Sequence, residues 1–90
     1  MKYNFSEVEV KDITGKTLDI KVGEALGNAL YISTKDLGMV ESAMKIYRGE
    51  DVELDKTEIE EVKRVVQDEK TGFFSFVQKA MLDYIESKKS

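Results

Sequence analysis

Seven carboxylates lie within residues 50–61, where Lys56 is the only basic residue. Such a segment would hold Ca²⁺ if it followed the EF-hand loop, which requires oxygen ligands at positions 1, 3, 5 and 9, a glycine at 6 and a Glu at 12. Counted from Asp51, the first three of these positions fit. Positions 6, 9 and 12 are instead occupied by Lys56, Ile59 and Val62. The spacing therefore excludes an EF-hand loop.

Helix capping explains part of the same segment. Asp55 and Glu58 match the capping box, in which the first side chain caps a helix and an acid three residues later caps back. Acids in the first turn also interact favourably with the positive end of the helix dipole. Two other interpretations stay open, a metal site of another kind and an acidic surface that contacts a partner. The candidate residues for that surface are Glu53, Glu58, Glu60 and Glu61.

Two residue types that are central to enzyme chemistry are missing, and carboxylates, lysines and tyrosines remain. The chain has no His and no Cys, which removes the commonest general base and the best thiol nucleophile. No Ser lies in a Gly-x-Ser-x-Gly turn, and Gly23, Gly27 and Gly38 match neither phosphate-binding glycine pattern. We therefore predict that the protein is not an enzyme, with no catalytic residues, no cofactor and no metal.

Three phenylalanines, Phe73, Phe74 and Phe76, lie close together before the C-terminal residues. On a helical wheel Phe73 and Phe74 fall within the apolar arc, whereas Phe76 is at its margin and Leu82 falls on the polar face. If Phe76 and Leu82 pack against a hairpin or a loop, they are structural. Exposure of both would indicate a contact with a partner or with a second copy, because exposed apolar patches mark such surfaces.

Length and composition bound the class of protein. Ninety residues without cysteine predict one domain, residues 1–90, with a single core and an intracellular, reducing location. We expect a soluble protein of the cytoplasm, or of the host cytoplasm if a phage encodes it, because neither a signal peptide nor a long apolar run is present. A net charge of −4 argues against direct nucleic-acid binding.

Alternation of polar and apolar residues predicts an N-terminal β-hairpin over residues 1–22, with a glycine-containing turn at residues 12–16. A two-stranded hairpin is marginal alone, so helices must cover one of its faces. The expected covered face consists of Val8, Val10, Leu18, Ile20 and Val22.

Residues 23–90 form the helical part of the predicted α+β fold, in which the hairpin packs on three to four short helices. Helical spacing predicts helices over residues 24–32 and 36–48, a third from Lys56, and a last one over residues 73–87. The third helix has a narrow apolar stripe, which places it outside with one edge on the core. We expect the last helix to supply much of the core.

The order of elements resembles a group of short uncharacterised proteins encoded by phages and prophages. The resemblance rests on EALGNAL, on a helix and acidic link reading MKIYRGEDVELDKTEIEEVKRVV, and on an aromatic last helix, and it spans roughly residues 23–85. It implies a phage-related origin and a protein-binding role in virion assembly or in managing a host factor. It carries no functional residue.

Two functions are expected from different classes. The first is a non-enzymatic interaction module that binds itself or a protein partner. The alternative is an acidic regulator that imitates nucleic-acid charge and blocks a nucleic-acid-binding protein. Binding of the second kind weakens with salt and needs Glu53, Glu58, Glu60 and Glu61, whereas binding of the first kind depends on Phe76 and tolerates salt.

Overall fold

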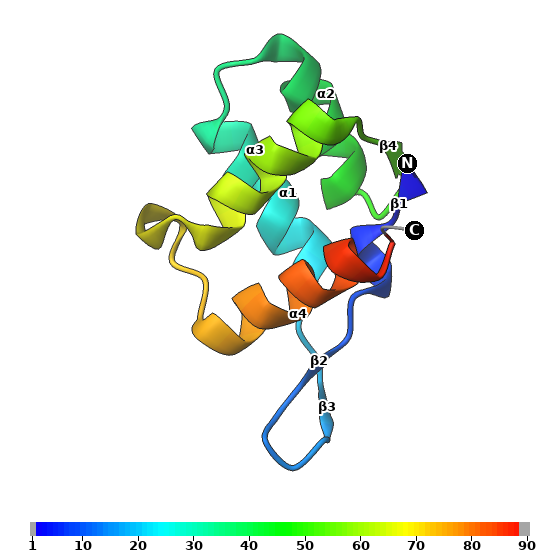
Figure 1. Ribbon diagram of the computed structural model, residues 1–90, viewed down its shortest axis with the longest axis vertical. Coiled ribbons are helices and arrows are strands. Elements are labelled where there is room, and N and C mark those ends of the chain that lie inside the picture. Colours follow the sequence, from blue (N-terminus) through cyan, green and yellow to red (C-terminus); the bar gives the residue numbers. More distant parts are fainter. Residues whose placement is uncertain (1, 89–90) are drawn as a thin grey trace.

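A computed structural model describes residues 2–88 and confirms the α+β fold, with a small hairpin near the N-terminus and four helices (Figure 1). The helices pack around one hydrophobic core. Short 3₁₀ turns at Phe5–Glu7 and Glu69–Thr71 join some of the elements. The strands are β1 (Lys2–Tyr3), β2 (Val10–Lys11), β3 (Thr17–Leu18) and β4 (Val52–Glu53), and the helices are α1 (Val22–Ser33), α2 (Leu37–Tyr47), α3 (Lys56–Gln67) and α4 (Ser75–Ser87).

The hairpin is shorter than its sequence pattern suggests. Only β2 and β3 pair, with Val10 opposite Leu18 and Lys11 opposite Thr17. Phe5 lies in a 3₁₀ turn because the Asn4 side chain accepts a hydrogen bond from the Ser6 N–H and caps that turn. Of the expected covered face, Val8, Val10 and Val22 are buried, and Leu18 and Ile20 pack against the core with part of their surface exposed.

The hairpin turn is organised by Asp12. Its Oδ1 accepts hydrogen bonds from the Thr14 N–H at 2.9 Å and the Lys16 N–H at 3.1 Å, and it also accepts one from the Thr14 hydroxyl. Gly15 adopts φ +89°, in the left-handed region that favours glycine in such a turn. The Thr14 hydroxyl and then the Lys16 N–H hold the pKa of Asp12 below its usual value.

We expect the hairpin turn to loosen in acid. A carboxyl whose pKa is lowered by folding stabilises the fold above its unfolded pKa, and that stabilisation is lost as pH falls through the lower, folded pKa. Amide exchange at Thr14 and Lys16, followed by NMR from neutral pH down to below about 3.9, should therefore show falling protection. In an Asp12→Asn variant this acid response should be absent. Equal acid responses in both proteins would contradict the assignment to Asp12.

A second strand pair, which the sequence did not predict, joins β1 to residues 50–61, called the acidic segment below. β1 pairs antiparallel with β4, which places Lys2 opposite Glu53 and Tyr3 opposite Val52. Asn4 strengthens the junction by donating from its side chain to the Asp51 carboxylate at 2.9 Å and to the Gly49 carbonyl at 3.3 Å. The Asn4 N–H donates to the Tyr84 hydroxyl at 2.8 Å, so the segment after β1 contacts α4 here (Figure 1).

The starts of α2 and α3 follow local capping rules. Asp36 caps α2 through the Gly38 N–H, and α3 begins at Lys56 with the predicted capping box. The apolar stripe of α3 is buried, as expected for the part of this helix that faces the core. This stripe consists of Ile59, Val62, Val65 and Val66.

The last helix contributes less core than expected. α4 begins at Ser75 and not at residue 73, so a helical wheel drawn through the preceding phenylalanines does not describe their directions. Phe74 occupies the N-cap position in extended conformation, with φ −68° and ψ 150°. The buried residues of α4 are Val77, Met81 and Ile85, whereas Phe74 and Phe76 are exposed.

Candidate functional site

The link between α3 and α4 is fixed by local hydrogen bonds. The Thr71 hydroxyl lies 2.7 Å from the Asp68 carbonyl and 3.1 Å from the Val65 carbonyl, and the Asp68 side chain accepts from the Lys70 N–H. Gly72 then turns the chain at φ +75°. Phe73 packs partly buried against the core, and the next residue, Phe74, is exposed. The link therefore presents one ring inward and the next to solvent.

Phe74 and Phe76 form an exposed aromatic pair. Their ring centroids lie 6.1 Å apart with an interplanar angle of 10°, a stacked arrangement. The two residues keep 72% and 44% of their surface exposed. Because the rings already contact each other, they present a preformed apolar surface at the start of α4.

The structure gives different exposures to the two residues that the wheel placed at the margin of the apolar arc and on the polar face. Phe76 is exposed, but Leu82 is partly buried and packs against the core. Leu82 therefore does not extend the surface around Phe76 as expected. Phe74, which the wheel directed toward the core, stacks on Phe76 in its place because α4 starts one residue after it.

At least two of the four candidate acidic residues have intramolecular roles. Glu58 accepts from the Asp55 N–H at 3.1 Å in the capping box, and Glu61 pairs with the Arg64 guanidinium. The hydrogen bond from Arg64 lowers the pKa of Glu61, which keeps this carboxyl ionised. Glu60 is exposed on α3, and Glu53 lies in β4 with its residue exposed. The structure therefore distributes the four acids over a strand, a cap and a helix face.

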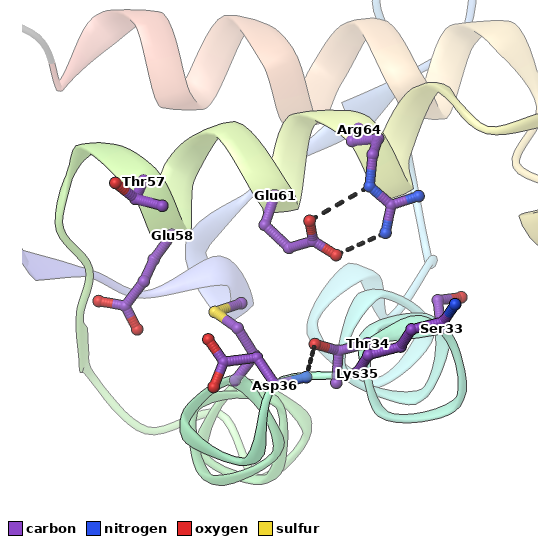
Figure 2. A pocket seen from close by; sticks show the side chains of 9 residues that line it. Ser33, Thr34, Lys35, Asp36, Thr57, Glu58, Glu61 and Arg64 are labelled. Atoms are coloured by element: carbon purple, nitrogen blue, oxygen red, sulfur yellow. Dashed lines mark hydrogen bonds and ion pairs between the residues drawn. The ribbon is translucent and has the colours of Figure 1, made fainter.

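A polar cavity of about 550 Å³ lies beside Glu58 and Glu61 (Figure 2). The link between α1 and α2 forms its other side, with Thr34 and Asp36, and the carboxylates of Asp36 and Glu58 extend from two different helix starts. Asp36 and Glu58 both cap these helices, and Glu61 is paired with Arg64. Among residues 2–88, no three or more His, Cys, Asp and Glu side chains are arranged to hold a metal ion.

A second, apolar groove of about 280 Å³ lies between α1 and α2. Tyr31, Met44 and Tyr47 line it and keep 54%, 41% and 52% of their surface exposed. Gly27 and Ala43 also line it, where the two helices lie closest together. The sequence pattern does not define this groove, because its residues come from two helices whose relative rotation is set by tertiary packing.

No protein-family model, curated protein or solved structure matches this chain. In the part of the chain that the structure describes, no helix has both the length and the apolar character needed to cross a membrane. Functional inference therefore depends on the surfaces described above.

Proposed function

We propose that this protein is a non-enzymatic interaction module that binds another protein through Phe74 and Phe76. The observation that carries this proposal is the stacked aromatic pair, which leaves most of Phe74 and nearly half of Phe76 exposed. Aromatic residues are enriched in protein interfaces because they bury a large apolar area. Burying this pair against a partner would remove that area from water.

The position of the aromatic pair next to a hydrogen-bonded link favours binding. Phe74 lies at the N-cap of α4, and the preceding link is held by the Thr71 hydroxyl and by Asp68. A preformed pair loses less conformational freedom on binding than two independent side chains would lose. The resemblance to phage and prophage proteins suggests two classes of partner, a virion protein and a host factor.

Charge mimicry has less support from the same geometry. At least five of the seven carboxylates in residues 50–61 have an intramolecular partner at hydrogen-bond or ion-pair distance, and such partners weaken an array that imitates phosphates. These five are Glu50, Asp51, Asp55, Glu58 and Glu61. The two classes of binding still respond differently to salt, so one experiment separates them.

Site-specific photo-crosslinking tests the proposal. A benzophenone side chain introduced at Phe76 should capture a discrete protein from an extract of the source cells, and the same group at Glu60, exposed on α3, should not. Phe74→Ala in the Phe76-labelled protein should abolish the capture, because it removes half of the pair. Since Phe74 is largely exposed, this variant should keep the thermal midpoint of the parent.

Salt dependence supplies the second criterion. Capture through an aromatic contact should persist at about 1 M salt, where the Debye length is only about 3 Å. Capture that is lost at high salt, or that is equally strong from position 60 and insensitive to Phe74→Ala, would overturn the proposed aromatic site. Loss of binding on neutralising Glu53 and Glu60 would support charge mimicry instead.

A further inference from the structure

Exposed apolar surface is concentrated on α1 and α2. Of the eight large hydrophobic residues exposed in the described chain, five lie on these two helices. Three of the five, Tyr31, Met44 and Tyr47, line the apolar groove between the helices. The groove is separate from the Phe74 and Phe76 pair, since neither phenylalanine lines it. The protein therefore has a second exposed apolar surface, on α1 and α2, in addition to the aromatic pair.

The α1 and α2 surface has the features of a self-complementary interface. A two-fold interface uses the same patch on both subunits, so the patch must offer both a projection and a recess that receives it. Here the half-exposed rings of Tyr31 and Tyr47 lie beside the recess that they help to line. The thioether of Met44 adapts to irregular surfaces, which suits a site that must receive an aromatic ring.

Charge distribution favours a second copy as the occupant. Residues 22–48, which contain α1 and α2, hold three basic and three acidic residues, so their net charge is zero. The rest of the chain therefore carries the entire net charge of −4. Two identical acidic molecules repel each other least when they meet through a neutral surface and keep their acidic segments apart.

The helices that form the surface are held firmly. α1 and α2 pack so closely that a Cβ atom at Gly27 would lie 2.6 Å from the Tyr47 backbone nitrogen and 2.8 Å from the Ala43 carbonyl oxygen. A rigid helical pair can dock on another without reorganisation, as in four-helix bundles. We propose that two copies of this protein associate through α1 and α2, with Tyr31, Met44 and Tyr47 at the centre of the interface.

Light scattering coupled to size exclusion, repeated over a series of protein concentrations, tests the proposal on the purified protein. We expect the mass of a dimer at the higher concentrations. Met44→Lys should shift the protein to the mass of a monomer, because it adds a second positive charge to a groove that Arg48 also lines and places it among the apolar side chains of each copy. Phe74→Lys is the matched control, since it also replaces an exposed apolar side chain by lysine but lies outside the groove, and it should remain dimeric.

Circular dichroism should show that both variants keep the helical content of the parent. If Met44→Lys does not fold, Tyr31→Lys, across the groove on α1, replaces it. A parent protein that stays monomeric at every concentration would overturn the proposal, and so would a dimer that survives Met44→Lys or Tyr31→Lys. A dimer dissociated by Phe74→Lys alone would move the self-interface to the aromatic pair. None of these masses depends on capture of a partner at Phe76.

Discussion

Gly27→Ala should destabilise the protein by about 2–3 kcal/mol, the upper part of the typical range for an overpacked core. The added methyl group would lie 2.6 Å from the Tyr47 nitrogen, 2.7 Å from its Cβ and 2.8 Å from the Ala43 carbonyl oxygen. Two of these three atoms belong to backbone, so a change of side-chain rotamer cannot relieve the contact. α1 and α2 must move apart, which opens the core on both sides of them. Urea unfolding followed by circular dichroism measures the loss.

Gly38→Ala is the matched control for this prediction. Gly38 also lies in a helix, but among the described residues a methyl group there would closely approach only the carboxylate of Asp36, at 3.3 Å, and no backbone atom of another element. Replacing glycine by alanine inside a helix gains about 1 kcal/mol from backbone entropy. Gly38→Ala should therefore be neutral or mildly stabilising. Similar midpoints for the Gly27 and Gly38 variants would show that the helix contact is looser than these distances indicate.

The stability margin makes the effect of Gly27→Ala easy to observe. Domains of this size are typically stable by only about 5–15 kcal/mol, so a loss of this size is a large fraction of the total. Separation of α1 and α2 would also widen the apolar groove lined by Tyr31 and Tyr47. The variant should therefore weaken the proposed self-association as well as the fold, whereas Met44→Lys should affect mainly the association.

Features governed by neighbouring residues could be predicted from the sequence. The capping box of Asp55 and Glu58 and the hairpin turn each depend on chemistry within a few residues. The structure contains both. The α+β class could also be predicted, because residues 1–22 alternate between polar and apolar types whereas residues 23–90 show helical spacing.

Features that depend on tertiary contacts could not be predicted. β1 and β4 are two residues each and lie about 50 positions apart, so neither shows the alternation that identifies a strand. The exposure of Phe74 depends on a helix start one residue beyond it, within the usual uncertainty of helix boundaries. The candidate site is therefore the least predictable part of the molecule, since the exposure of Phe74 depends on one helix boundary and the partial burial of Leu82 depends on packing against the core.

Leu54→Ala should lower the free energy of unfolding by about 3 kcal/mol, the middle of the range for deleting a buried leucine side chain. Leu54 is 1% exposed and lies inside the acidic segment, two residues after the buried Val52. These apolar residues hold the segment against the core, and its acids alternate with them toward solvent. Val52 and Leu54 therefore anchor the segment in the core, although most of its residues are acidic.

Glu60→Gln provides the contrast, because Glu60 is exposed and its replacement keeps size and shape. Surface substitutions of this kind usually change stability by less than about 0.5 kcal/mol. If urea unfolding gives a large loss for Leu54→Ala and almost none for Glu60→Gln, residues 50–61 stabilise the fold mainly through their buried apolar side chains. A larger loss for Glu60→Gln would instead assign the stabilising role to charge. Because Leu54 anchors the segment, Glu60 can be replaced without unfolding the protein. A loss of partner capture in the Glu60→Gln variant would therefore report a role of this carboxylate in binding.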